Sequence, residues 1–501
     1  MRRLLRAAVP ACLFVTLLGT CTLAVVPVAS APVPAPAELD AEVAAFYRAR
    51  QFRPLWLDGR ALKPAARTML AMAGNEPRLA AALAAAEAGD RRALSRADLM
   101  LSQAFADRAR ARFQPPATNA MRYIDPGLAP APRTTAEILG TAAGAPDLAA
   151  HVDAVARVNP PLAGLERGLT LYRQRWSRLP QTALPRNPAP GQLRHRLGAN
   201  DLGAFQRIHG LTVTGRADPA TIAALNRGAA HYERLIRANI ERARAIPARP
   251  GGRYILVDTA SAQLFMVENS RIARRMRVVV GKRAMQTPLM AGMIRYAMLN
   301  PYWNLPPDLI RERARKGLRA IQAEHLEVLS DWSPQARRLD PRRVDWRAVA
   351  AGRRLVNLRQ TPGPHNMMGR IKFMLPNDLG IYLHDTPHRE LFARADRRAS
   401  SGCVRLEDAG RLERWLFGAR VPRASGAPEQ RVDLPAPVPV YITYLTVLPT
   451  ADGVVFQRDA YSRDVSGASA PRRGARARHA APAPSRARHG RAAAARPVRR
   501  P

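Results

Sequence analysis

The pattern of hydrophobic and polar positions divides the chain into a helical first half and a strand-rich second half. From residue 37 to residue 190, apolar residues, many of them alanine, recur at helical spacing and are interrupted by proline and glycine. The most distinctive apolar residues of this stretch are Phe46, Tyr47, Leu55 and Trp56. We therefore expect a helical scaffold domain over 37–190, in which nothing points to catalysis.

A compact helical module is predicted over residues 191–228. Within it, Leu202, Phe205 and His209 keep helical spacing on one face. A later helix is expected to begin at Asp218, which occupies the position of an N-cap, with Pro219 as the first helical residue. The helical pattern then continues as a connector over 229–250.

Alternation of apolar and polar positions predicts a mainly β domain over 253–448. Met276, Val278 and Val280, for example, fall on one face of a strand. The predicted strands are 254–258, 263–267, 272–281, 371–375, 381–384 and 438–447. A charged, helical insertion at 306–354 interrupts them, and it is either a lid over a site or a surface excursion. The predicted fold class is α+β.

The N-terminus has the layout of a secretory signal over residues 1–31. A start rich in arginine precedes a mostly apolar stretch that ends at Val28, and Ala29-Ser30-Ala31 fits a cleavage site of small residues. The alternative is an uncleaved membrane anchor, because the apolar stretch is long enough to span a bilayer. Either interpretation places the rest of the chain outside the cytoplasm.

The C-terminal tail, residues 466–501, is expected to be disordered. It consists mainly of Ala, Pro, Arg and Gly and carries no acidic residue from position 471 onward. Such a composition cannot bury enough apolar surface to fold. The tail is either a basic tether or a passive extension.

The charge balance of the chain is strongly basic, with 79 Lys and Arg against 39 Asp and Glu. Nearly all of the positive charge is arginine, which together with the abundant alanine and proline indicates a coding bias. The functional interpretation is attraction to an anionic polymer such as a carboxylate-rich wall. A nucleic-acid partner is not expected, because no zinc knuckle, RNP motif or recognition-helix pattern accompanies the charge.

Cysteine usage singles out one thiol. Of the three cysteines, Cys12 and Cys21 lie in the predicted export segment, so a cleaved protein would keep only Cys403 and could form no internal disulfide. A lone thiol in an oxidising compartment is at risk of oxidation unless it has a role. The alternative is a buried, inert cysteine.

The sequence around Cys403 favours a nucleophile. His384 ends a predicted strand nineteen residues earlier and would act as base, and Arg405 adds positive charge beside the thiol. Gly402 allows close approach of the backbone, so that amides around Gly402 and Cys403 could form an oxyanion hole. A backbone carbonyl beside His384 would orient the imidazole.

Three other interpretations of these residues remain open. His384, His388 and Cys403 could bind a metal ion, although Pro387 disfavours the helix that their spacing needs. His384 could be a structural histidine at a strand end. Another exported cysteine enzyme is the third, but papain-like and NlpC/P60-type peptidases place Cys before His, and sortases separate the two residues much further.

The second half of the chain resembles the L,D-transpeptidase catalytic domain of the YkuD type, in its large Gram-negative branch with scaffold and peptidoglycan-binding regions. In place of the common Ser-His-Gly-Cys signature, the chain has Ser400-Ser401-Gly402-Cys403-Val404-Arg405, so no histidine can act at position 401. Further matching motifs are Val279–Lys282, Gln286–Pro288, Asn300–Pro306, Gln360–Pro364, Gly369–Phe373, Pro376-Asn377 and Val438–Thr446.

The helical module at 191–228 resembles the small three-helix peptidoglycan-binding domain. The residues that carry this resemblance are Ala204-Phe205-Gln206, Gly210-Leu211, Thr214-Gly215, Asp218, Thr221 and Leu225-Asn226. The two resemblances together cover most of the chain outside its termini.

The resemblance implies a reaction on peptidoglycan in the periplasm. Cys403 would release D-Ala from a tetrapeptide donor stem as a thioester forms, and a second stem would resolve it as a 3→3 cross-link. Water or a lipoprotein as acceptor are the alternatives, and a non-catalytic wall-binding protein is the alternative from another class. The family implies neither cofactor nor metal. Further candidates for contact with substrate are Ser401, Gly402, Arg405, Asp385, Tyr382 and Asn366.

Overall fold

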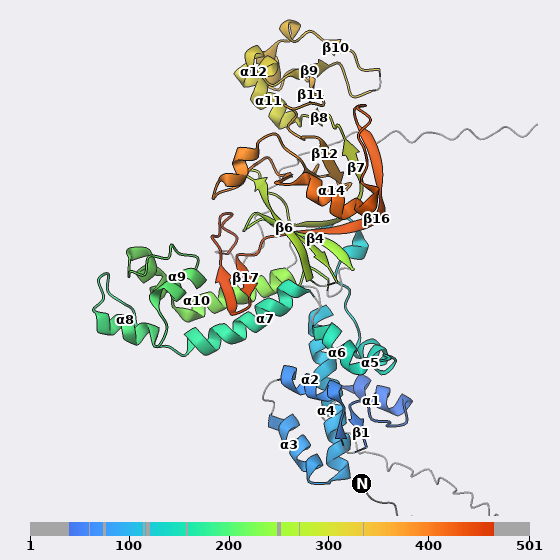
Figure 1. The fold of residues 1–501 in the computed structure, drawn as a ribbon, viewed down its shortest axis with the longest axis vertical. Coiled ribbons are helices and arrows are strands. Elements are labelled where there is room, and N and C mark those ends of the chain that lie inside the picture. Colours follow the sequence, from blue (N-terminus) through green and yellow to red (C-terminus); the bar gives the residue numbers. More distant parts are fainter. Residues whose placement is uncertain are drawn as a thin grey trace, which may run out of the picture.

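The computed structural model describes residues 40–464, except for 60, 74–76, 114–115, 117–120, 157–158, 248–251, 270 and 334. The predicted signal at 1–31, with Cys12 and Cys21, and the predicted tail at 466–501 lie outside the described residues. An N-terminal helical bundle, a helical arm and a cap flank a central sheet (Figure 1). Among the described helices, none is both long and apolar enough for a membrane span. The predicted α+β fold class is confirmed by this arrangement of helical and sheet-rich parts.

The N-terminal part is a bundle of helices centred on α4, which contacts α1, α2, α3 and α5. The elements are α1 (Ala41–Ala49), β1 (Leu57–Asp58), β2 (Ala61–Leu62), α2 (Pro64–Ala73), α3 (Pro77–Glu87), α4 (Arg91–Phe113), α5 (Thr135–Ala143) and α6 (Leu148–Ala156). A buried carboxylate, Asp98, accepts hydrogen bonds from the N–H groups of Leu55 at 3.0 Å and Trp56 at 2.8 Å. The hydroxyl of Tyr47 also donates to Asp98, so three of the four residues singled out from the sequence surround one buried acceptor.

The second helical part forms an arm to one side of the sheet (Figure 1). It consists of α7 (Pro160–Tyr172), the π-helical turn η2 (Arg173–Ser177), α8 (Pro190–Leu197), α9 (Leu202–Ile208) and α10 (Pro219–Ala243). The predicted cap of α10 is confirmed, since Asp218 accepts the N–H of Thr221 at 2.8 Å and Pro219 is the first helical residue. Gly228, at φ +74°, interrupts the helical backbone of α10.

Helix α7 packs with this arm, although the sequence pattern assigned it to the scaffold. Its apolar residues share one core with α10 and with a hairpin of β17 (Val447–Thr450) and β18 (Gly453–Phe456). The start of α7 is tied to the end of α10 by Asn159, whose Nδ2 donates to the carbonyls of Ala243 and Ile246, both at 2.7 Å. These contacts join residues more than eighty positions apart, which a local pattern does not reveal.

The central sheet closes on itself. Its path runs β12–β13–β15–β6–β5–β4–β16–β7, and β12 also pairs with β7. Its strands are β4 (Arg253–Asp258), β5 (Gln263–Glu268), β6 (Arg271–Gly281), β7 (Met290–Leu299), β12 (Ile371–Met374), β13 (Leu383–His384), β14 (Arg398–Ser400), β15 (Val404–Leu406) and β16 (Gln430–Thr443), with β3 (Arg122–Tyr123) added from the N-terminal part.

The interior of the closed sheet is an apolar core. Met276, Val278 and Val280 of β6 all face it, as the alternation in the sequence predicted. Helix α14 (Ala409–Phe417) contributes Leu412 and Leu416 to the same core. The side chains on the other face of these strands point out of this core.

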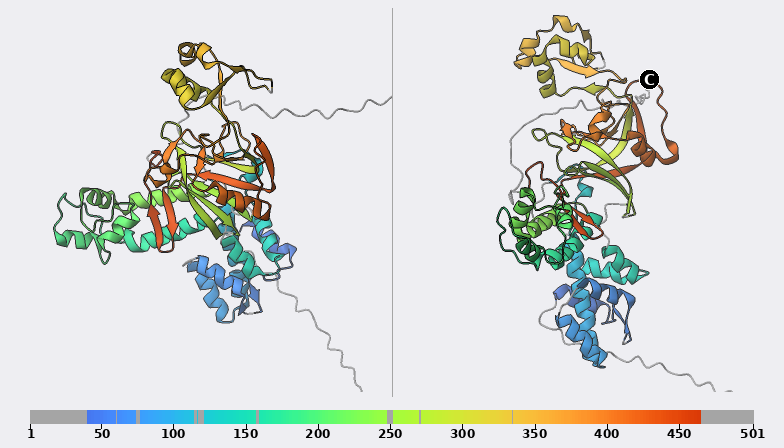
Figure 2. Two further views of the ribbon diagram at one scale, coloured as in Figure 1. Left: turned by 45° about the horizontal axis from the view of Figure 1, so that its top comes forward. Right: turned by 60° about the vertical axis from the view of Figure 1, so that its left-hand side comes forward.

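The insertion between β7 and β12 forms a separate cap (Figures 1 and 2). The insertion predicted at 306–354 contains helices, as expected, and the cap also contains an antiparallel sheet in the order β10-β9-β11-β8. The charged sequence of the insertion did not reveal these short strands. The elements are β8 (Trp303–Asn304), α11 (Pro307–Lys316), α12 (Leu318–Ala323), β9 (Leu326–Leu329), β10 (Arg338–Leu339), η3 (Pro341–Arg343), α13 (Trp346–Ala350) and β11 (Asn357–Gln360).

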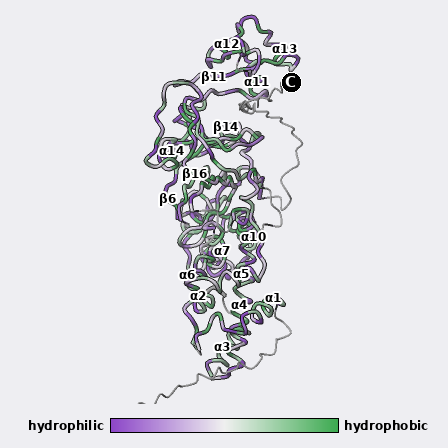
Figure 3. Tube along the Cα trace, turned by 90° about the vertical axis from the view of Figure 1, so that its right-hand side faces the viewer, coloured by the Kyte–Doolittle hydropathy of each residue, from purple (hydrophilic) through white to green (hydrophobic). Residues whose placement is uncertain are grey.

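Each part has its own hydrophobic core, and the cap is no exception. Hydrophobic and hydrophilic stretches alternate along the chain in all of them (Figure 3). The cap begins and ends at β8 and β11, which pair side by side, so that Gln360 lies opposite Trp303. The cap is therefore joined to the central sheet through one narrow, two-stranded base.

Candidate active site

Strand register places Cys403 and His384 on the same face of the central sheet. β13 and β15 are parallel, with Leu383 opposite Val404 and His384 opposite Arg405. Leu383 and Val404 are both fully buried in the apolar core. Because side chains alternate between faces, His384, Arg405 and the preceding Cys403 point to the other face. The nucleophile and base predicted from the sequence are thus diagonal neighbours on adjacent strands.

His384 is held as a neutral imidazole with one free nitrogen. Its Nδ1 lies 2.6 Å from the carbonyl oxygen of Asp385, and since a carbonyl can only accept, Nδ1 carries the proton. Burial, together with the positive charges of Arg405 and Lys372, lowers the pKa of His384 to about 3, against the opposing effect of the hydrogen bond to the Asp385 carbonyl. Nε2 is therefore left as a proton acceptor at neutral pH.

Cys403 is a partly buried free thiol. Its Sγ lies 3.4 Å from the carbonyl oxygen of Gly380, to which the S–H donates. Burial raises the pKa of the Cys403 thiol, and the backbone of Tyr382 and the charge of Arg405 partly offset that rise. Together with the lowered pKa of His384, this favours a neutral thiol–imidazole pair at rest rather than an ion pair.

The loop that carries the nucleophile is fixed by side-chain hydroxyls. Ser400 donates its hydroxyl to the carbonyl of Cys403 at 2.6 Å and accepts the N–H of Gly402 at 3.2 Å. Thr287 donates to the carbonyl of Gly402 at 2.7 Å. Gly402 itself has φ +121°, a conformation that favours glycine.

These contacts determine which backbone N–H group is free to donate a hydrogen bond to an oxyanion. The N–H of Gly402, predicted as a donor, is already engaged by Ser400. No hydrogen bond among the described residues engages the N–H of Cys403, which leaves this amide as the available donor beside the thiol. Neither Ser400 nor Thr287 was predicted from the sequence. Thr287 lies 115 residues from Gly402, and its only local signal was the Gln-Thr-Pro motif.

A pocket of about 360 Å³ opens over this face, between the sheet and the cap. From the sheet, it is lined by Tyr382, His384, Ser401, Cys403 and Arg405, all predicted as site residues. From the cap come residues of β8, α11, α13 and β11, including Trp303, Leu309, Val349 and Asn357. The cap therefore lies over the candidate site, and the surface-excursion interpretation does not fit its position.

Arg405 enters this pocket without an acidic partner. None of the ion pairs among the described residues involves Arg405, and its Nε is buried with no hydrogen-bond partner. Burial lowers the pKa of the guanidinium, which remains close to Cys403. An unpaired, buried cation of this kind favours an anionic group on a bound molecule.

Two predicted contact residues lie elsewhere. Asn366 is 1 % exposed, and its side chain is used by the backbone: Nδ2 donates to Pro301 and Thr361, both at 2.9 Å, and Oδ1 accepts from Met368 at 2.7 Å. It does not line the pocket and instead holds the loop after β11. The physical reason is that buried carbonyls in a tight loop need a donor.

Asp385 faces away from the thiol. Its carboxylate pairs with Arg389 at 2.5 Å and accepts the N–H of Arg370 at 3.0 Å, in a separate pocket of about 320 Å³. Alternation along the chain after β13 turns its side chain to the opposite side from His384. Only its carbonyl contributes to the site, by orienting the imidazole.

The metal-site interpretation finds no geometric support in the described part of the chain. There, no group of three or more His, Cys, Asp or Glu side chains comes together as a metal would require. His388 is exposed and interacts with Glu390 at 3.1 Å, whereas His384 is buried. The two histidines therefore occupy different environments.

Comparison with protein families assigns the domain in which these residues lie. Residues 252–422 match the YkuD family, described as the L,D-transpeptidase catalytic domain. The chain carries a YkuD-type L,D-transpeptidase catalytic domain. Residues 41–169 match the Scaffold domain, and residues 200–225 match a family described as "Putative peptidoglycan binding domain". The resemblance predicted from the sequence is confirmed.

Individual relatives of this transpeptidase domain are distant. A curated protein of Haemophilus influenzae, named "Putative L,D-transpeptidase", is 31 % identical over 237 residues, which are 45 % of this chain and 47 % of that protein. The chain thus spans about half the length of the curated relative.

Two solved structures also resemble the chain, but only weakly. An L,D-transpeptidase from Mycobacterium smegmatis shares 12 % identity over 38 % of this chain and 58 % of its own, with a TM-score of 0.20. An Enterococcus faecium L,D-transpeptidase, solved as a cysteine-to-serine mutant, shares 11 % over 42 % and 63 %, with a TM-score of 0.19. The family assignment does not rest on either structure.

Proposed function

We propose that the chain is an L,D-transpeptidase that forms 3→3 cross-links in peptidoglycan through a thioester on Cys403. The observation that carries this proposal is the register of β13 and β15. It puts the side chains of Cys403 and His384 on one face of the sheet, in the pocket under the cap. The YkuD match over 252–422 supports a transpeptidase, and the peptidoglycan-binding match at 200–225 supports peptidoglycan as its substrate.

The first half-reaction is acylation of the thiol. As Cys403 Sγ attacks the carbonyl carbon between the third residue and D-Ala of a donor stem, His384 Nε2 takes the thiol proton. A C–S bond forms and the C–N bond to D-Ala breaks, with the proton returned from the imidazolium to the leaving amine. The free N–H of Cys403 would stabilise the oxyanion of the tetrahedral intermediate.

The second half-reaction resolves the thioester. The side-chain amine of a diamino acid on an acceptor stem attacks the carbonyl carbon, so that a C–N bond forms as the C–S bond breaks. The amine loses a proton to His384, which passes it to the departing thiolate. Both half-reactions balance in protons and bonds without a redox step. Their chemistry uses the thiol of Cys403 and the imidazole of His384.

Arg405 is proposed to hold a carboxylate of the donor stem. Its guanidinium has no ion-pair partner among the described residues and lies in the pocket with the thiol, and stem peptides of the wall carry carboxylates at the third residue and at the D-Ala terminus. A charge-assisted contact there would fix the register of the stem against Cys403. This contact would also explain why a cation is retained at a buried position.

We further propose that the chain acts outside the cytoplasm, in the periplasm. The support is the sequence layout of residues 1–31, with a basic start, an apolar stretch and a small-residue cleavage site. Fractionation of cells that express the full chain, together with N-terminal sequencing of the mature protein, tests this. Recovery in the cytoplasm with an intact N-terminus would contradict export.

The cross-linking activity is tested by mass analysis of muropeptides from cells lacking other L,D-transpeptidases. Wild-type chain should produce dimers joined between two third residues, and Cys403→Ala should produce none while the protein still co-sediments with sacculi. Tripeptides without new dimers would identify an L,D-carboxypeptidase. Cross-links that persist in Cys403→Ala would overturn the enzymatic proposal, and wall binding without any product would leave a binding protein.

A further inference from the structure

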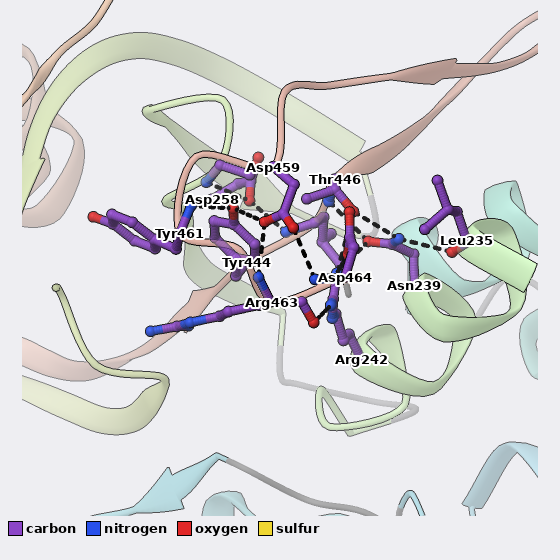
Figure 4. Close-up of polar contacts among 12 residues, drawn as sticks. Leu235, Asn239, Arg242, Asp258, Tyr444, Thr446, Asp459, Tyr461, Arg463 and Asp464 are labelled. Atoms are coloured by element: carbon purple, nitrogen blue, oxygen red, sulfur yellow. Dashed lines mark hydrogen bonds and ion pairs between the residues drawn. The ribbon is translucent and has the colours of Figure 1, made fainter. Parts of the chain in front are cut away.

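The segment that follows hairpin β17–β18, residues 457–464 and here called the strap, folds tightly on itself. The carboxylate of Asp459 accepts the N–H groups of Arg463 and Asp464, both at 2.9 Å, and the hydroxyl of Tyr444 at 2.6 Å. The ring of Tyr461 stacks on that of Tyr444, with centroids 5.2 Å apart. Figure 4 shows these groups gathered in one cluster between α10 and the sheet.

One end of the strap is anchored on the helical arm. Asp464, at the end of the strap, pairs with Arg242 of α10 at 2.7 Å, and its carboxylate is only 9 % exposed. Asn239 of the same helix donates to the hydroxyl of Thr446 at 3.0 Å, and Thr446 donates to Asp464, also at 3.0 Å (Figure 4). The strap and the arm therefore form one connected polar network.

The other side of the strap contacts the loop after β6, residues 281–287. The buried hydroxyl of Tyr461 donates to the carbonyl of Gly281 at 2.5 Å. Arg463, whose guanidinium lies over the rings of Tyr444 and Tyr461, donates to the Gln286 side chain at 2.6 and 3.0 Å. These contacts hold the loop at both of its ends.

The 281–287 loop in turn holds the backbone of the nucleophile. Thr287 accepts the N–H of Gly281 at 2.9 Å and donates to the carbonyl of Gly402, the residue before Cys403. Lys282 donates its N–H to the carbonyl of Ser400 at 2.9 Å. A side chain at position 281 would overlap the carbonyl of Met285, so the loop has little freedom to adopt another shape.

We propose that the strap positions the nucleophile: Tyr461 and Arg463 hold the 281–287 loop, and through Thr287 and Gly402 they set where the Cys403 thiol and amide face the substrate carbonyl. Tyr461 and Arg463 are positioning residues, since neither lines the pocket. This inference rests on the proposed function. The strap lies outside the matched catalytic domain at 252–422, so it adds a part to the active site that the family match does not contain.

A positioning role and a purely stabilising role of the strap predict different effects on two reactions of Cys403, alkylation and acylation. Alkylation by iodoacetamide needs only an accessible thiolate, because the reagent is small and has no carbonyl to align. Acylation by imipenem needs the carbonyl placed against both the thiol and the donor amide. A misplaced Gly402–Cys403 backbone therefore slows acylation while alkylation and thermal stability persist.

The test compares Tyr461→Phe with Tyr441→Phe in the full chain. Tyr441 is an equally buried tyrosine of the sheet whose hydroxyl has no hydrogen-bond partner, so it is a matched control. We expect Tyr461→Phe to slow acylation of Cys403 by imipenem about tenfold, measured by intact-protein mass, with alkylation and Tm close to those of Tyr441→Phe. Thr287→Val should behave like Tyr461→Phe, and Thr287→Ser, which keeps the hydroxyl, should restore the rate.

Two results would overturn the inference. One is equal acylation rates for Tyr461→Phe and Tyr441→Phe. The other is a Tyr461→Phe protein in which the acylation rate, the alkylation rate and the Tm all fall together. That result would make the strap a purely stabilising element. If wild-type protein is alkylated at Cys403 but never acylated, the proposed function fails, and the inference that rests on it fails with it.

Discussion

At the scale of single residues, the site depends on a neutral pair. His384 has its pKa lowered to about 3, chiefly by burial, and the pKa of Cys403 is raised, also by burial. A proton must therefore move from sulfur to nitrogen during attack, and no preformed thiolate is available.

This electrostatic state predicts the pH dependence of acylation. Because the imidazole stays neutral well below its ordinary pKa of about 6.5, the rate of acylation by imipenem should show no loss as the pH falls from about 7 to about 5. Removing the base in His384→Ala should lower the rate at neutral pH by roughly 10²- to 10⁴-fold. Stopped-flow acylation over this pH range checks both statements, and a rate that halves near the ordinary pKa of histidine would contradict the neutral pair.

His209 predicts a second pH effect, on stability. Burial among aromatic rings lowers its pKa to about 3, against the opposing contact with the Phe205 carbonyl. Since the folded pKa lies below the unfolded value of 6.5, the stabilisation is complete above pH 6.5 and is lost as the pH falls toward 3. The free energy of unfolding of the arm should decrease by roughly 1 kcal/mol per pH unit in that window.

Thermal unfolding between about pH 7 and about pH 4.5 measures this dependence. His209→Phe keeps an aromatic ring against Phe456 and removes the titrating group, so its Tm should change less with pH than that of wild type. His195→Phe is the control, because His195 is exposed on α8. An unchanged pH dependence in His209→Phe would refute the role of this residue.

At the scale of elements, two glycines let hairpin β17–β18 lie against α7. A Cβ at Gly168 would overlap the side chain of Val454, and one at Gly164 would meet Pro449 at 2.5 Å. The two positions are one helical turn apart and share a face. The hairpin leads directly into the strap, so its seat on α7 fixes where the strap begins.

Gly168→Ala should therefore destabilise the arm, by about 1–3 kcal/mol of overpacking. The control is Gly140→Ala in α5, where an added Cβ meets nothing within 4 Å and the substitution should stabilise by about 0.4–1 kcal/mol. Urea unfolding of both variants measures the difference. A Gly168→Ala protein as stable as wild type would show that the hairpin can shift away from α7.

At the scale of the whole molecule, the cap is an independent unit over the site. It has its own core, and it joins the sheet through β8 and β11, where Leu305 donates its N–H to the carbonyl of Leu358 at 2.9 Å. Pocket walls on one side come from the cap and on the other from the strands of Cys403 and His384. Substrate must therefore enter between two separately folded bodies.

Replacing residues 306–357 with a two-residue Asn-Gly turn should leave the sheet folded, because β8 and β11 are antiparallel neighbours. We expect cross-linking to fall about 10²-fold from the loss of one pocket wall, while alkylation of Cys403 by iodoacetamide becomes faster. Muropeptide analysis and alkylation kinetics measure the two effects. Cross-linking at the wild-type rate would show that the cap does not hold the substrate.

How much of the fold and of the site can be predicted from the sequence depends on how far apart along the chain the contacting residues lie. The strands, the N-cap at Asp218 and the pair of Cys403 and His384 are local patterns, and their residue types are set by backbone geometry and thiol chemistry. The α+β fold class followed from these patterns, and the transpeptidase domain followed from the resemblance of its motifs to the YkuD family. The sequence could not show that Asn366 and Asp385 contact backbone groups, because a polar residue in a motif can serve either a substrate or a buried backbone group.

Only the tertiary structure decided the surroundings of the nucleophile. The pairing of Cys403 with His384 on one face follows from strand register, and the hydroxyl of Thr287 reaches Gly402 across 115 residues. Tyr461 reaches Gly281 across 180 residues, and the cap folds over a site from a base made by β8 and β11. The sequence by itself determined which chemistry is present. The geometry that supports that chemistry required the fold, because contacts between distant segments arise only when closure of the sheet brings them together.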